Sequence, residues 1–140
     1  MRLISYKKNG ESRIGLRREG DILDLSIIAP GLPTSIVGLL EIGSEAMVAA
    51  VTAGEAAGVD AIVSPEEITY APVTPRPPKI ICIGRNYAAH AREGGVEPPS
   101  YPEIFYRGAT SLVGHNQPIL RPLCSDKLDY EAELVAIVGK

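Results

Sequence analysis

Residues 129–139 read Asp-Tyr-Glu-Ala-Glu-Leu-Val-Ala-Ile-Val-Gly, a short apolar segment that also contains two glutamates. Successive side chains of a strand point to opposite faces, so Glu131 and Glu133 would project from the same face. Val135 and Ile137 continue that face, and the opposite face is apolar as well. The pattern predicts a strand that is covered on both sides.

Two carboxylates on one face of a buried strand repel each other and are costly to bury without a partner. A hard divalent cation such as Mg2+, Mn2+ or Ca2+ is the simplest partner for Glu131 and Glu133. The alternative is that both side chains reach solvent at the beginning of the strand. The spacing alone leaves both interpretations open.

The composition is that of an ordinary globular protein, with 45% hydrophobic and 22% charged residues in a chain of 140. A net charge of -3 argues against a nucleic-acid partner, because such proteins usually carry a basic stripe. Cys82 and Cys124 are too few for a disulfide framework, and Cys82 is interpreted as a core residue. No signal peptide or membrane span is recognisable, so we expect a soluble protein of the reducing cytoplasm without a membrane partner.

The chain divides at a proline-rich stretch. Residues 1–70 predict a small amino-terminal module, in which strands at 1–7 and 12–18 flank an Asn-Gly turn and a helix follows at 45–57. The segment 71–78 cannot extend a helix or sit in a central strand, and it predicts a stiff linker. Residues 79–140 then form a second region.

The second region begins with an apolar run at 79–83 that predicts a buried strand, followed by a short helix within 85–95 that ends at two glycines. His90 and Glu93 are three residues apart and would share one helical face. Without further context such a pair is more often a surface ion pair than a catalytic one. Strands are expected near 105–107 and at 118–123.

The order of the segments 80–90, 105–107 and 129–134 resembles the fumarylacetoacetate hydrolase family, specifically bacterial members that act on acylpyruvate-like or homoprotocatechuate-pathway substrates. The resemblance implies an α+β fold, in which a small β/α module precedes the beginning of a mixed β-sandwich roll. It also implies that the family's remaining portion, with most of the sheet and the interface of a homodimer, lies beyond Lys140. We therefore expect a truncated catalytic domain.

The resemblance implies roles for seven residues. Glu131 and Glu133 fall on the first two members of a metal-binding acidic triad, whose third member is an aspartate further along the chain. His90 and Glu93 fall on the family's catalytic pair, on a short helix that acts as a lid. The substrate-binding positions are Arg85, Tyr87 and Arg107.

Arg107 stands where many relatives of that family carry lysine. Arginine keeps the positive charge but presents a planar fork, so it remains suited to gripping a substrate carboxylate. Tyr87 is equally well interpreted as a packing residue.

The leading functional hypothesis is metal-assisted hydrolysis of a C–C bond in an acylpyruvate-like 2-oxo acid, with His90 activating water and Glu93 orienting the imidazole. Isomerisation or decarboxylation of 2-oxo or hydroxymuconate acids at the same site is the nearest alternative. The sequence is also compatible with a noncatalytic fragment, and with a module that binds a small molecule without chemistry.

Overall fold

The structure, a computed structural model, describes residues 1–128 and 133–139. The described residues form two compact units: residues 1–74 with the segment from Val113 onward, and Pro75–Leu112. The strands are β1 Arg2–Lys8, β2 Glu11–Arg18, β3 Asp21–Asp24, β4 Ile62–Val63, β5 Thr69–Tyr70, β6 Ile80–Gly84 and β7 Glu103–Arg107. The helices are α1 Leu25–Ile28, α2 Ile36–Ile42, α3 Ser44–Ala56 and α4 Ala88–Glu93, with short 3-10 turns η1 Val59–Ala61, η2 Pro65–Glu67 and η3 Ala109–Ser111.

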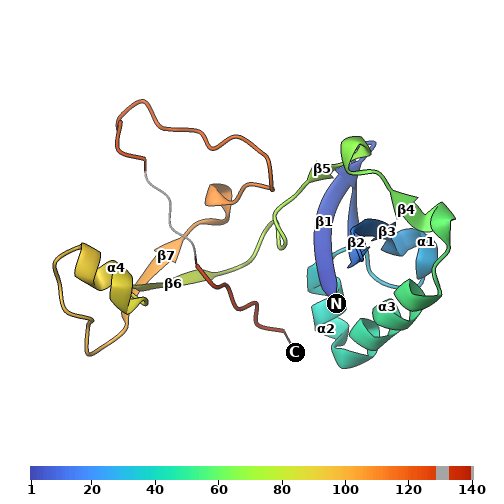
Figure 1. Cartoon of the computed structure of the whole chain (residues 1–140), viewed down its shortest axis with the longest axis horizontal. Coiled ribbons are helices and arrows are strands. Elements are labelled where there is room, and N and C mark those ends of the chain that lie inside the picture. The colour runs from blue at the N-terminus through green and yellow to red at the C-terminus, as the bar shows by residue number, and fades with distance from the viewer. Residues whose placement is uncertain (129–132, 140) are drawn as a thin grey trace. The chain divides into compact units, whose positions relative to one another are not determined.

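The first unit is built on an antiparallel five-stranded sheet in the order β4-β3-β2-β1-β5 (Figure 1). The expected hairpin between β1 and β2 is confirmed, because Lys8 pairs with Glu11 across a two-residue turn. Both turn residues, Asn9 (φ 52°) and Gly10 (φ 82°), lie in the left-handed region that this turn requires. The local turn chemistry therefore fixes the register of the first two strands.

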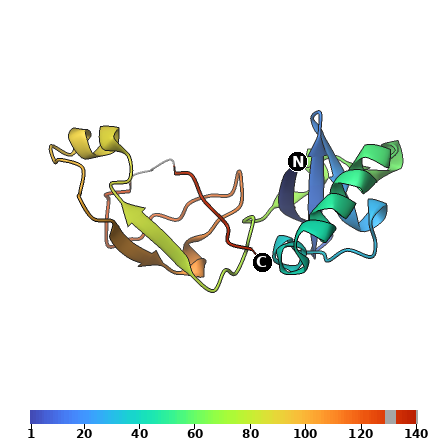
Figure 2. The same ribbon diagram turned by 90° about the horizontal axis from the view of Figure 1, so that it is seen from below.

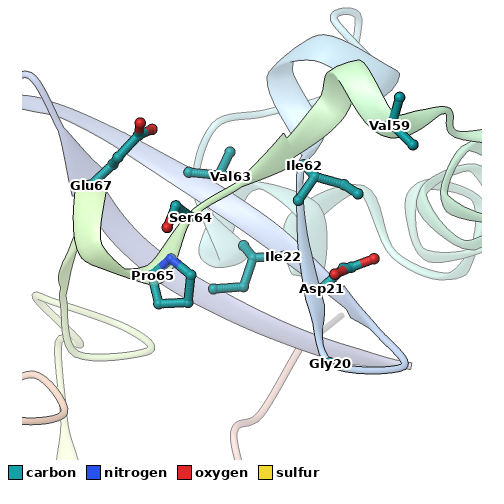
Figure 3. Close-up of a pocket in the computed structure, with 9 residues that line it drawn as sticks. All are labelled: Gly20, Asp21, Ile22, Val59, Ile62, Val63, Ser64, Pro65 and Glu67. Carbon is teal, nitrogen blue, oxygen red and sulfur yellow. The ribbon is translucent and has the colours of Figure 1, made fainter.

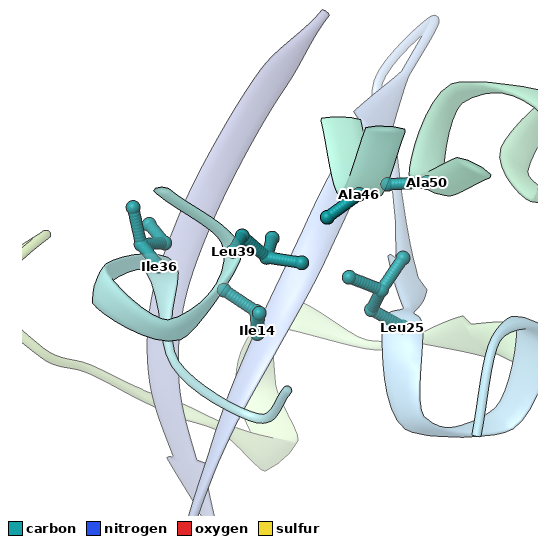
Figure 4. Packing of buried hydrophobic residues seen from close by; sticks show 6 residues of the cluster. All are labelled: Ile14, Leu25, Ile36, Leu39, Ala46 and Ala50. Atoms are coloured by element: carbon teal, nitrogen blue, oxygen red, sulfur yellow. The ribbon is translucent and has the colours of Figure 1, made fainter. Parts of the chain in front are cut away.

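One face of this sheet is covered by helices, as the two ribbon views show (Figures 1 and 2). Leu16 and Leu23 lie opposite each other in the ladder and are both buried on that face. A larger apolar cluster joins β2 to the three helices (Figure 4), and its members are Ile14, Leu25, Ile36, Leu39, Ala46 and Ala50. Small alanines on α3 let this helix pack closely on the sheet.

Side chains complete the ends of the helices. The Ser35 hydroxyl accepts a hydrogen bond from the Gly38 amide at 3.1 Å and so caps α2. Arg18 donates to the carbonyls of Gly54 (2.8 Å) and Ala57 (3.0 Å) at the end of α3. The arginine thus ties the last turn of this helix to strand β2.

The second unit contains the antiparallel pair β6-β7 and helix α4. The strand expected at 79–83 is confirmed in position, but its burial is not: Ile81 is 63% and Ile83 50% exposed. Cys82 is half-buried rather than a core residue. A two-stranded sheet buries little by itself, and no described helix of this unit covers these side chains.

One further expectation, the strand at 118–123, needs correction. Residues 118–123 form no strand and are exposed, because Pro118 and Pro122 interrupt any ladder. The two-residue strands β4 and β5 were not expected from the sequence.

The segment 71–78 contains neither helix nor strand, and the predicted domain limits at 70 and 78 stay a prediction. Among the described residues, no helix has the length and apolar character needed to cross a bilayer.

Candidate functional site

The chain passes directly from β6 into the segment that carries the predicted catalytic pair. β6 ends at Gly84, and Arg85 follows in the left-handed region with φ 52°, which is uncommon for a residue with a Cβ. Tyr87 then occupies the cap position before α4. This turn sends α4 away from the end of β6, beside the point where β7 begins (Figure 1).

His90 and Glu93 both lie on α4, as the sequence predicts, and both are exposed. Ala91, between them, is completely buried and anchors the helix. The helix ends at the two expected glycines: the Gly94 amide donates to the His90 carbonyl at 3.2 Å, and the Gly95 amide to the Arg92 carbonyl at 2.9 Å. Gly95 has a φ of 69°, which suits glycine at a helix end.

The three predicted substrate-binding residues do not all lie at one end of the β6-β7 pair. Arg85 follows Gly84, which pairs with Glu103, whereas Arg107 pairs with Ile80. These two rungs are four residues apart, or about 13 Å along a strand. Arg85 and Tyr87, which lie between β6 and α4, are therefore at one end of the ladder, and Arg107 is at the other.

The two arginines also differ in their contacts. The Arg85 Nη1 atom is 3.9 Å from the Glu103 Oε1 atom, in an ion pair that is open to solvent. The Arg107 guanidinium carbon lies 5.9 Å from the centre of the Phe105 ring, in a cation–π arrangement. Sequence reasoning missed Glu103, because the predicted strand covers only 105–107 and the pairing of Gly84 with Glu103 is not visible in a local pattern.

The predicted metal ligands are described only in part. Glu131 lies outside the described residues, and Glu133 is exposed. The buried strand predicted here is wrong for the described residues 133–139, which form no strand and include Leu134 at 89% and Val138 at 93% exposure. An apolar run becomes a strand only when a neighbouring strand completes its ladder.

The donor chemistry of Glu131 and Glu133 suits a hard divalent cation such as Mg2+, Mn2+ or Ca2+. In residues 1–128 and 133–139 there is no group of three or more His, Cys, Asp or Glu side chains that could hold a metal ion. The metal-binding role of the two glutamates stays a prediction.

An open pocket of about 510 Å³ lies on the first unit, between β3 and β4 (Figure 3). It is lined by Gly20, Asp21, Ile22, Val59, Ile62, Val63, Ser64, Pro65 and Glu67. None of the seven predicted site residues is among them. The sequence did not indicate this pocket, because it depends on the pairing of Ile22 with Val63, forty-one residues later.

Comparison with known proteins identifies relatives of both parts of the chain. The sequence profile described as "Fumarylacetoacetate (FAA) hydrolase C-terminal" matches residues 79–140. A mitochondrial oxaloacetate tautomerase of Xenopus laevis is 39% identical over 145 residues, which cover 100% of this chain and 44% of that protein. A mitochondrial oxaloacetate tautomerase of Bos taurus is 39% identical over 121 residues, which cover 86% of this chain and 38% of that protein. The chain thus spans less than half the length of these curated relatives.

An uncharacterized protein of Pyrococcus abyssi is 49% identical over 65 residues, 46% of this chain and 29% of that protein. Two solved structures share the fold. A fumarylacetoacetate hydrolase from Exiguobacterium antarcticum has a TM-score of 0.56 at 20% identity, covering 79% of this chain and 36% of that one. A putative HpcE protein from Mycobacterium smegmatis has a TM-score of 0.60 at 21% identity, covering 85% of this chain and 40% of that one.

These likenesses confirm the expected α+β fold. Together with the profile match and the identities to the curated relatives, they also confirm the resemblance carried by the motifs at 80–90 and 129–134. Residues 79–140 match the carboxy-terminal domain of the fumarylacetoacetate hydrolase family, and over its whole length the chain is similar to an oxaloacetate tautomerase.

Proposed function

We propose that this chain is part of a divalent-metal-dependent enzyme that forms the enol or enolate of a small 2-oxo acid. The observation that carries the proposal is the placement of His90 and Glu93 on one short, exposed helix directly after Arg85 and Tyr87. The names of two curated relatives, both oxaloacetate tautomerases, support keto–enol isomerisation of oxaloacetate as the reaction.

His90 is the group proposed to move the proton. An imidazole can act first as a general base and then as a general acid, so it can remove a proton from C3 of the 2-oxo acid and return one to the oxygen of C2. This exchange converts the keto form into the enol without any net gain or loss of atoms. Glu93, one helical turn away, would orient the ring and stabilise its protonated form.

Arg85 is the better candidate for the substrate carboxylate, because the β6-β7 register puts Arg107 at the opposite end of the pair. Its planar fork matches a carboxylate with two parallel hydrogen bonds. A divalent cation held by Glu131 and Glu133 would supply Lewis-acid polarisation of the 2-oxo group when bound.

Hydrolysis of a C–C bond in an acylpyruvate is the second candidate. The same His90 and Glu93 pair could activate water, whose oxygen would attack the distal carbonyl. The C–C bond would then break to give a carboxylic acid and the enolate of pyruvate, which takes up a proton. Decarboxylation of oxaloacetate would pass through the same enolate. The reaction products therefore distinguish the three chemistries.

We predict that His90→Ala lowers turnover of oxaloacetate enol or of an acylpyruvate by about 10²–10⁴-fold in the presence of Mg2+. The enol is followed by its ultraviolet absorbance, and pyruvate release is followed with a coupled dehydrogenase. The chain contains only one other histidine, so His115→Ala is a matched control that should keep full activity. Unchanged turnover in His90→Ala would remove the proposed role.

The biological setting also remains a proposal. We propose a homodimer in the cytoplasm, with a small 2-oxo acid as substrate and neither nucleic acid nor membrane as a partner. Light scattering of the purified chain with and without Mg2+ would test the dimer, and a monomeric mass under both conditions would contradict it.

A further inference from the structure

Gly84 and Glu103 face each other on the last rung of the β6-β7 ladder. A Cβ atom placed on Gly84 would meet the Glu103 Cβ at 3.2 Å, its carbonyl oxygen at 3.3 Å and its Oε2 atom at 3.4 Å. Two of these three atoms belong to the side chain, so the Glu103 carboxylate folds across Gly84. Glycine has no Cβ, so it leaves room for the Glu103 side chain at this position.

Beyond Gly84, the Glu103 carboxylate reaches Arg85. The Glu103 Oε1 atom is 3.9 Å from the Arg85 Nη1 atom, and the side chains remain 54% and 45% exposed. This contact involves one terminal nitrogen of a guanidinium group that has five N–H donors. The remaining donors stay available to a second anion, and the exposure of the pair lets a ligand approach it.

The backbone at Arg85 is a second, independent feature. Its φ of 52° places a residue with a long side chain in the left-handed region, where such residues are strained. Strain of this kind recurs where a side chain must be held in a particular place. Here it occurs at the junction between β6 and the helix that carries His90.

We propose that Glu103 is a positioning residue for Arg85. It holds one edge of the guanidinium so that the other donors can bind a carboxylate ligand beside α4. The inference rests on the proposed function, in which Arg85 binds the carboxylate of a 2-oxo acid. Pre-pairing the flexible arginine lowers the conformational entropy that is lost when the ligand binds.

The first experiment measures ligand binding. Oxalate, a small dicarboxylate, is titrated calorimetrically into the full chain in the presence of Mg2+. Glu103→Gln should raise the Kd about two- to fivefold, as expected for the loss of one exposed charge pair. Arg85→Gln should raise it about tenfold or more, and adding Glu103→Gln to Arg85→Gln should have no further effect.

Glu97→Gln is the matched control. Glu97 is exposed, belongs to the same unit and forms no ion pair among the described residues, so the same loss of charge should leave the Kd unchanged. An equal rise of the Kd in Glu103→Gln and Glu97→Gln would indicate a general effect of charge and would overturn the proposal. Tighter binding in Glu103→Gln would also overturn it, because Glu103 would then compete with the ligand.

The second experiment is independent of the ligand. The Arg85 side-chain Nε–H resonance, assigned by its loss in Arg85→Gln, should shift in Glu103→Gln and stay in place in Glu97→Gln. If wild-type chain binds no oxalate, the proposed function fails, and this resonance still decides whether Glu103 holds Arg85. Where turnover is measurable, Glu103→Gln should raise KM and leave kcat unchanged, since the residue acts through Arg85.

Discussion

At the scale of single residues, the most constrained polar group in the described chain is Asp24. Its side chain is 1% exposed, and it accepts hydrogen bonds from the Ser26 amide (2.9 Å), the Ser26 hydroxyl (2.6 Å) and Arg13 Nη1 (2.7 Å). The Tyr6 hydroxyl is buried near Asp24 and has no hydrogen-bond partner among the described residues. Asp24, at the end of β3, thus joins the cap of α1 to strand β2.

This arrangement predicts how stability depends on pH. Burial alone would raise the pKa of Asp24, but the hydrogen bonds from Ser26 and Arg13, together with the neighbouring Tyr6 hydroxyl, outweigh burial and lower it. A group whose pKa is lower in the folded state stabilises the protein above its unfolded pKa, about 3.9 for aspartate. That stabilisation should be lost as the pH falls below about 4, through the folded pKa.

We predict that Asp24→Asn lowers the free energy of unfolding by about 2–3 kcal/mol at pH 7, because Arg13 loses its buried partner. The difference from wild type should shrink as the pH falls below about 4, because unfolding of the wild-type chain is then coupled to protonation of Asp24. Urea unfolding at a series of pH values measures both effects. Asp21→Asn, on the same strand but exposed, is the control and should change stability by less than about 0.5 kcal/mol.

At the scale of elements, the closest approach between helix and sheet occurs where α3 crosses β2. Gly54 is buried on α3, and a Cβ atom there would collide with the Leu16 Cδ2 atom and lie 3.4 Å from Leu16 Cγ. Glycine usually weakens a helix interior by about 1 kcal/mol relative to alanine. At this position, the missing Cβ instead permits the packing of the helix on the sheet.

We therefore predict that Gly54→Ala destabilises the protein by about 1–3 kcal/mol, against the trend of helix propensity. Thermal unfolding would measure the change, and Thr52→Ala, at an exposed position on the same helix, should be neutral or slightly stabilising. Leu16→Val should recover part of the loss when it is combined with Gly54→Ala. A stabilised Gly54→Ala protein would show that the helix does not pack this closely.

The elements also show which features local sequence can predict. The Asn9-Gly10 turn and the glycines after α4 agree with prediction, because the conformation at these positions is set by the residues themselves. The helix predicted at 45–57 is α3, Ser44–Ala56, which begins one residue earlier and has Gly43 in the cap position. Cap positions shift by one residue easily, because neighbouring residues compete for the same role.

At the scale of the whole molecule, the errors concern features that depend on distant partners. β4 and β5 exist because Ile62 pairs with Leu23 and Thr69 with Lys7, and neither pair is visible in a local pattern. The run 133–139 has the composition of a strand but forms none. In the candidate site, the sequence predicts correctly that His90 and Glu93 lie on one helix. The separation of Arg107 from Arg85 follows only from the register of the β6-β7 pair, which the sequence does not reveal.

The distribution of buried side chains over the described chain leads to a last prediction. Every buried apolar residue except Ala91 lies within residues 1–74, including Tyr6, Leu23 and Leu39. In contrast, the β6-β7 pair leaves Ile104 69% and Tyr106 62% exposed. Apolar burial is the main favourable contribution to folding, so cooperative unfolding should originate in residues 1–74.

A chain of residues 1–74 should accordingly unfold in urea as a single cooperative transition, at the midpoint measured for the 140-residue chain by circular dichroism. Leu39→Ala should destabilise both chains equally, by about 2–5 kcal/mol, because Leu39 is fully buried in the cluster that both contain. Val48→Ala, at an exposed position on α3, is the control and should have little effect on either. A gradual, uncooperative loss of signal from residues 1–74 would mean that their core requires contacts from the rest of the chain.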